Sequence, residues 1–253
     1  MNHIFGLSLP SSLLVFCALG LVAYGIGRTA LFHFSRRVDE NASSVPIGAF
    51  IGPVATAWAL SLGFAAADIW ALNAKADQAT NDERSSISRL LGVSRPEVLD
   101  AKQIHALTEQ YARFVIEEEW GRQKNTEPSL VVDAILHDIR REIVQLPAAG
   151  VPSPIISKIV NDFDELQDAR IVRLSLGTTS IDMYKWYLLM FLTLLTVVTI
   201  AATHADRRKA GEIAIRIYVV TAIFSLWIIA IHANPYQGID RIEPTVLRPM
   251  HAQ

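Results

Sequence analysis

The chain has 253 residues, 51% of them hydrophobic and 19% charged, and its formal net charge is −2. This near-balance of charge argues against a protein that binds nucleic acid through a broadly basic surface. The hydrophobic residues gather in four blocks, at residues 12–34, 47–71, 184–203 and 213–233. Each block is close to the roughly 20 residues with which a helix crosses a bilayer core, and each is too long for the strands of a soluble α/β fold.

The four blocks predict an all-α, multi-pass membrane protein with four transmembrane helices and a helical soluble insert between the second and the third. We divide the chain into a first transmembrane pair at 1–74, the insert at 75–183, a second transmembrane pair at 184–234 and an extended tail at 235–253. The insert carries 18 acidic and 13 basic residues, so its helices should be solvated on one face and packed on the other. The bilayer is therefore the first expected partner.

The second block predicts a helix with a ridge of small residues on one side. A small residue stands at every fourth position, and the set is Ala55, Ala59, Gly63, Ala67 and Ala71. Small residues allow close helix packing in lipid, where association has little hydrophobic drive. The ridge therefore predicts a contact between helices, within or between subunits, and an alternative is that part of this helix lines a pore.

The second helix is expected to be longer than the bilayer is thick. Beyond Trp70 its helical spacing continues, without Gly or Pro, as far as Gly92. Asp68 falls about 21 residues after Ile47, which places it at the membrane boundary. That position fits a solvated carboxylate at the interface, and it also fits an acid that attracts ions at the mouth of a pore.

The third block carries a stripe of threonines on one helix face. They are Thr193, Thr196, Thr199 and Thr203. Because a threonine hydroxyl can bond a carbonyl of its own helix, such a stripe is inexpensive in lipid. We interpret it as a contact between helices, with a wet ion path as the alternative.

The insert is expected to hold further helices at about 95–121 and 127–146, and another that runs from residue 155 toward the third block. Ser94 is expected to cap the first of these, since a proline and a glutamate follow it at the spacing of a helix start. From residue 239 on, the tail contains two prolines and is expected to run extended along the surface.

The sequence shows no arrangement of residues that points to catalysis. It has no phosphate-binding glycine loop, no nucleophile elbow and no zinc-binding helix motif. The acidic run at residues 117–120 lacks the glycine and the alternating oxygen ligands of a calcium-binding loop. We therefore expect a protein that is not an enzyme and that needs no cofactor or metal.

The basic residues of the short loops predict an orientation. These loops hold Arg36, Arg37, Arg207, Arg208 and Lys209. Because loops rich in Lys and Arg stay in the cytoplasm, the charge count places the insert and both termini on the other side of the membrane.

Four stretches of the sequence carry a family resemblance. They are GFAAADIWALNAKADQATNDERSSISRLL from residue 63, YARFVIEEEW from residue 111, RIVRLSLG from residue 170 and NPYQGIDRIEPTVL from residue 234. Together they resemble a family of bacterial membrane proteins described as bestrophin-like, from about residue 45 to 248. The order of two spans, a helical insert and two spans is also similar, more distantly, to that of the bestrophin anion channels.

The resemblance implies a homo-oligomeric channel, a pentamer in the bestrophins, that passes inorganic anions through the bacterial inner (plasma) membrane. The second helix would line the path, with Leu62, Phe64, Asp68 and Ile69 as candidates for its wall. Apolar constrictions of this kind can gate by dewetting. The acidic calcium-binding segment of bestrophins is missing, because the tail holds only Asp240 and Glu243.

Two questions stay open at the level of sequence. The resemblance implies a cytoplasmic insert, whereas the charge count places it outside the cytoplasm. The alternative function is a non-enzymatic membrane sensor or scaffold, whose insert would bind a partner through a groove or an apolar patch on residues 95–175.

Overall fold

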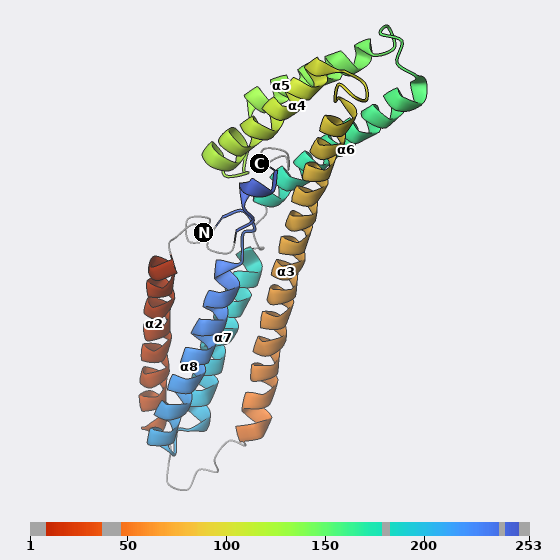
Figure 1. The fold of residues 1–253 in the computed structure, drawn as a ribbon. Helices are drawn as coiled ribbons and strands as arrows, with labels where there is room; N and C mark the ends of the chain where they lie inside the picture. The colour runs from red at the N-terminus through yellow and green to blue at the C-terminus, as the bar shows by residue number, and fades with distance from the viewer. Residues whose placement is uncertain (1–8, 37–46, 179–182, 238–240, 248–253) are drawn as a thin grey trace. The chain divides into compact units, whose positions relative to one another are not determined.

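The computed structural model describes residues 9–36, 47–178, 183–237 and 241–247. Most of these residues are helical, and the described ranges contain no strand. The elements, in chain order, are α2 (Leu9–Ser35), α3 (Ile47–Val93), α4 (Lys102–Phe114), the π-helix η1 (Val115–Arg122), α5 (Leu130–Gln145), α6 (Ser153–Thr178), α7 (Met183–Thr203), α8 (Arg208–Ile231) and the short 3₁₀ helix η2 (Pro244–Leu247) (Figure 1).

The chain divides into two compact units, and α3 contributes to both. The membrane unit comprises residues 1–71 and 180–233, and the insert unit comprises 72–179 and 234–253. Four helical segments of the described chain are long and apolar enough to cross a bilayer. The prediction of an all-α protein with four transmembrane helices and a helical insert is thus confirmed.

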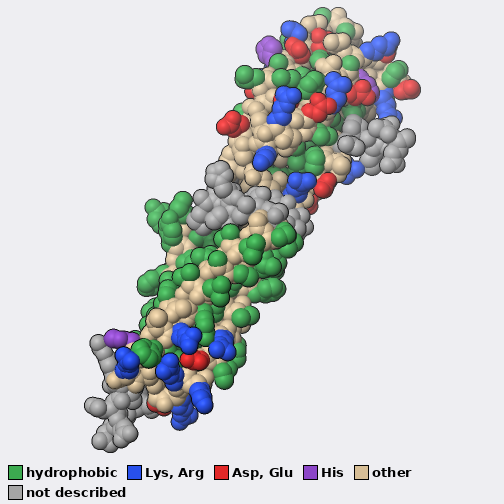
Figure 2. Space-filling view, turned by 90° about the vertical axis from the view of Figure 1, so that its left-hand side faces the viewer, with side chains coloured by type: hydrophobic (Ala, Val, Ile, Leu, Met, Phe, Trp, Pro, Cys, Tyr) green, Lys and Arg blue, Asp and Glu red, His purple; other side chains and the backbone are tan. Residues whose placement is uncertain are grey.

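In the membrane unit, glycines let α2 approach α7 and α8 closely. A Cβ atom built on Gly27 would lie 2.5 Å from Cγ1 of Val197 and 2.9 Å from Cγ2 of Ile215, and one on Gly20 would lie 3.1 Å from Cγ1 of Ile223. Close backbone approach of this kind is how helices associate in lipid. On the face shown in Figure 2, hydrophobic side chains cover the middle of this unit, and Lys and Arg side chains gather at one end.

The threonine stripe of α7 is buried inside the membrane unit. The hydroxyl of Thr193 donates a hydrogen bond to the carbonyl of Leu189, at 2.7 Å, and that of Thr196 donates to Leu192, also at 2.7 Å. Thr199 and Thr203 bond the carbonyls of Leu195 and Thr199 in the same way. Because these hydroxyls are satisfied within their own helix, they can be buried without cost against the neighbouring helices. The stripe is thus a contact between helices, as interpreted from the sequence.

The insert unit has one apolar core, to which the tail also contributes. Buried side chains of α3, α4, α5 and α6 surround it, together with Tyr236 and Leu247 from the tail. The hydroxyl of Tyr236 donates to the carbonyl of Ala76 at 3.2 Å, and the ring meets Trp120 edge-on. The described part of the tail therefore differs from the expected extended surface segment, because Tyr236 and Leu247 are buried in the core.

The first helix of the insert begins later than the sequence suggested. Ser94 does not cap it: the Ser94 hydroxyl donates to the carbonyl of Leu91, at the end of α3. The next residues form turns, and Asp100 has a left-handed backbone with φ of 50°, so α4 starts only at Lys102. The expected continuation of α6 into the third span falls on residues 179–182, which lie outside the described ranges.

A buried ion network joins α3, η1 and α6 of the insert, and Tyr111 of α4 bonds to it. Arg173 of α6, fully buried, donates to Glu83 of α3 at 2.5 Å and to Glu119 of η1 at 2.7 Å. Arg170 also donates to Glu119, and the Tyr111 hydroxyl donates to Glu83 at 2.6 Å. Burial raises the pKa of Glu119, but the hydrogen bonds and charges of the two arginines outweigh it and hold that pKa below its ordinary value. Glu119 therefore contributes stability at neutral pH that is lost on acidification through its lowered pKa.

We expect Arg173→Met to lower the free energy of unfolding of the insert by about 3–5 kcal/mol, because it leaves two buried carboxylates without their shared partner. The matched control is Arg141→Met, which removes an exposed ion pair with Asp138 and should change stability by about 0.5 kcal/mol or less. Chemical unfolding of the detergent-purified protein measures both. Equal effects of the two substitutions would show that the buried network does not hold the insert together.

Candidate functional site

The small-residue ridge of α3 lies on the outer surface of the membrane unit. Ala59, Gly63, Ala67 and Ala71 are exposed, and Ala55 is half-buried. A Cβ atom built on Gly63 would meet nothing within 4 Å. Among the described residues, then, the ridge is not used to pack the chain's own helices, although its shape suits close packing.

The opposite side of α3 holds the helix against the rest of the membrane unit. Ile69 is 1% exposed and packs in a core cluster with Ala65, Trp186 and Leu226. Nearer the other end of the span, the Trp58 indole donates to the hydroxyl of Thr193 at 2.9 Å. The transmembrane part of α3 therefore has one packed side and one open side.

The four candidates for a pore wall fall on different sides of this helix. Phe64 is 68% exposed, and Asp68, one helical turn further along, is also exposed. Leu62 is half-buried against two of the core clusters. Ile69 lies in the chain's own core. The structure thus brings Phe64 and Asp68 together on the open side and separates Ile69 from them.

Asp68 has a partner that the sequence analysis missed. Lys185, at the beginning of α7, forms an ion pair with its carboxylate, and both side chains are about half exposed. The two residues stand 117 positions apart, so no local spacing reveals the pair. The sequence offered one indication of this pair. Asp68 and Lys185 each lie where a span meets the insert, so two neighbouring spans would place them at the same depth in the membrane. The charge of Asp68 is therefore locally balanced.

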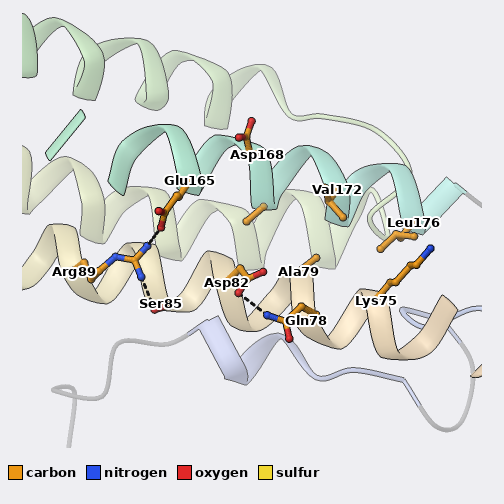
Figure 3. Close-up of a pocket in the computed structure, with 11 residues that line it drawn as sticks. Lys75, Gln78, Ala79, Asp82, Ser85, Arg89, Glu165, Asp168, Val172 and Leu176 are labelled. Atoms are coloured by element: carbon orange, nitrogen blue, oxygen red, sulfur yellow. Dashed lines mark hydrogen bonds and ion pairs between the residues drawn. The ribbon is translucent and has the colours of Figure 1, made fainter. Parts of the chain in front are cut away.

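A groove on the insert unit runs between α3 and α6. Its volume is about 530 Å³, and charged side chains from both helices line it, including Lys75, Asp82, Arg89, Glu165 and Asp168 (Figure 3). Arg89 binds Glu165 and also donates to Asp162 of α6 at 2.6 Å. Because two basic and three acidic side chains line the groove, neither sign of charge dominates it, and the groove favours neither an anionic nor a cationic small molecule.

Among the described residues, no group of three or more His, Cys, Asp or Glu side chains is placed to hold a metal ion. The candidate functional site is the open side of α3, which has the Asp68–Lys185 pair at its end.

Comparison with known proteins connects this fold to one family. A family described as a bestrophin-like domain matches residues 15–247. No curated protein gives a significant match.

Solved structures share the fold at low sequence identity. A crystal structure of a bacterial bestrophin homologue from Klebsiella pneumoniae, carrying one substitution, has 15% identity and a TM-score of 0.70, over 92% of this chain and 96% of that one. Another structure of a bestrophin homologue from the same organism has 15% identity and a TM-score of 0.70, over 91% and 93%. A structure described only as a membrane protein has 14% identity and a TM-score of 0.71, over 92% and 94%. Since the family match spans most of its length, the chain belongs to the bestrophin-like family of membrane proteins.

Proposed function

We propose that the protein is a homo-oligomeric ion channel, with α3 lining the path. The observation that carries the proposal is the two-sidedness of α3 within the membrane unit. One side packs on α7 and α8 through Trp58 and Ile69, whereas the ridge and Phe64 are left open. The resemblance to bestrophins, which are pentamers, supports a ring of copies.

The ridge and Phe64 would have separate tasks in such a ring. The small residues suit a close contact with a neighbouring copy, because they let backbones approach. A ring needs a contact between two different surfaces, so the ridge would meet another part of the next copy. Phe64, beside the ridge, would then face the axis and form the apolar constriction. Leu62 is a second candidate for the wall, and Ile69 is left out because it lies in the chain's own core.

We propose that the permeating ions are inorganic anions. A ring of unpaired carboxylates at the level of Asp68 would attract cations. The ion pair with Lys185 supports the opposite preference, because it balances that charge in every copy. The apolar wall would add no charge of its own.

Gly63→Leu is expected to break the oligomer and leave the single chain folded, since no atom of the chain lies within 4 Å of the new Cβ but a neighbouring copy would lie against it. Gly25→Leu is the control, because Gly25 of α2 is also exposed with open space around it. Size-exclusion chromatography with light scattering in detergent measures the number of copies. An unchanged oligomer in Gly63→Leu would remove the ridge from the subunit contact.

Removing one member of the ion pair should shift ion selectivity in a predictable direction. Lys185→Gln leaves Asp68 unbalanced and should raise potassium flux relative to chloride flux, whereas Asp68→Asn should do the reverse. The double variant should return toward the wild-type ratio. Reconstituted liposomes with opposing chloride and potassium gradients measure these ratios. If neither substitution changes the ratio of chloride to potassium flux, the pair lies away from the conduction path.

We propose further that the insert lies in the cytoplasm of the bacterial cell, as the family resemblance implies and against the charge count of the short loops. A reporter fused after Gln253 tests the orientation, because the tail and the insert lie on the same side of the last two spans. Fluorescence from a fused green fluorescent protein, with an inactive alkaline phosphatase fusion, is the expected result. The opposite pair of results would place the insert outside the cytoplasm and the basic loops inside.

The mixed-charge groove between α3 and α6 favours a second candidate function, that of a membrane sensor or scaffold. A polar, solvent-accessible surface of this kind resembles the rim of a protein interface. The absence of flux in wild-type liposomes under any gradient would favour this function over the channel, and the groove would then be the first surface to probe for a partner.

A further inference from the structure

A second groove lies in the membrane unit, between α2 and α8. Its volume is about 430 Å³, and its lining is almost wholly apolar, with Leu13, Cys17, Val220 and Trp227 among the side chains. Gly20 and Ile223 also line it, and the missing side chain of Gly20 lets α2 approach Ile223 closely. The groove therefore has the shape and chemistry to hold a hydrocarbon chain.

One end of this apolar groove carries an arginine. Arg216 is exposed on α8, and its neighbours Ile213, Ile217 and Val220 are exposed apolar residues. It therefore lies on the side of the helix that faces the surroundings of the bundle. Its guanidinium donates to the hydroxyl of Tyr24, at 3.1 Å, across the groove. A charged side chain on the apolar surface of a span is costly and points to a function.

Within the described ranges, the surroundings of Arg216 are short of negative charge. Arg208, Glu212 and Arg216 follow each other at intervals of four on α8, and Arg28 follows Tyr24 at the same interval on α2. Glu212 already lies 3.7 Å from Arg208 and 4.0 Å from Arg28. One carboxylate thus faces three guanidinium groups, and this end of the groove keeps a positive excess.

We infer that the groove between α2 and α8 is a binding site for an anionic phospholipid. The phosphate would lie at Arg216 and Arg28, and one acyl chain would extend along the groove toward Trp227. Arg216 and Trp227 are 11 residues apart on α8, which corresponds to ~16 Å of helix, a length that suits an acyl chain. The arginine side chain can reach toward the polar end of the span while its stem stays on the apolar surface.

The charges favour a lipid over a second copy of the chain as the occupant. The described acidic residues of the membrane unit are Asp68, Asp206 and Glu212, and each already lies beside a basic side chain. The described part of the membrane unit in a second copy would therefore bring no spare carboxylate to Arg216. The bilayer, by contrast, supplies phosphate and hydrocarbon together. The inference does not depend on ion conduction.

Quenching of Trp227 by brominated lipid tests the site. The full-length protein is reconstituted in phosphatidylcholine vesicles with a minor fraction of phosphatidylglycerol, and either lipid carries bromine on its acyl chain. The signal of Trp227 is the difference between each protein and its Trp227→Phe counterpart. In the wild type, brominated phosphatidylglycerol should quench well beyond its share of the bilayer. Arg216→Gln should lower this preference about fivefold, which corresponds to ~1 kcal/mol for one basic residue at a membrane surface.

Two further variants make the result specific. Arg28→Gln should also lower the preference, and it leaves the bond between Arg216 and Tyr24 in place. Lys209→Gln, in the first turn of α8 and about two helical turns from Arg216, should keep the wild-type preference. Equal quenching by the two lipids in the wild type, or an equal loss in Lys209→Gln, would overturn the site. No quenching by either lipid would also overturn it, and would indicate that a second copy covers the groove.

Discussion

The structure depends on one constraint, which is that α3 has to be a single helix in two solvents. In the bilayer every backbone donor and acceptor needs a partner within its own segment, and a continuous helix provides it. In the insert the same helix has to bury one stripe against other helices. Two kinds of contact therefore hold α3: apolar packing around Ile69 in the membrane unit, and the ion network around Glu83 in the insert.

These two kinds of contact suit their surroundings. Arg173 binds two carboxylates inside the insert, where the removal of one partner would leave a buried charge unpaired. Such a network ties together α3, η1 and α6 only in one arrangement. In the membrane unit, by contrast, glycines of α2 and hydroxyls of α7 allow close packing without charge. The open side of α3 is the part of the helix that neither kind of contact uses.

The charged residues of the membrane unit show what a linear pattern omits. Asp68 could be placed at the membrane boundary by counting, but its pairing with Lys185 comes from a helix far along the chain. Arg216 reads, in sequence, as a charge toward the end of an apolar block. Only the packing of α2 beside α8 places Tyr24 across from it and an apolar groove next to it. Pairing and exposure, which decide what a charge can do, are properties of the packed helices.

The sequence by itself determined the class of protein, because bilayer length and helical spacing are local properties. From them follow the four spans, the helical insert and the continuation of the second span beyond the membrane. Tertiary structure decided which side of α3 is open. Leu62, Phe64, Asp68 and Ile69 are close in sequence, yet Ile69 is buried and Phe64 is exposed, because the direction in which a helix packs depends on its partners. The burial of the tail residues Tyr236 and Leu247 was decided in the same way, by contacts with distant parts of the insert.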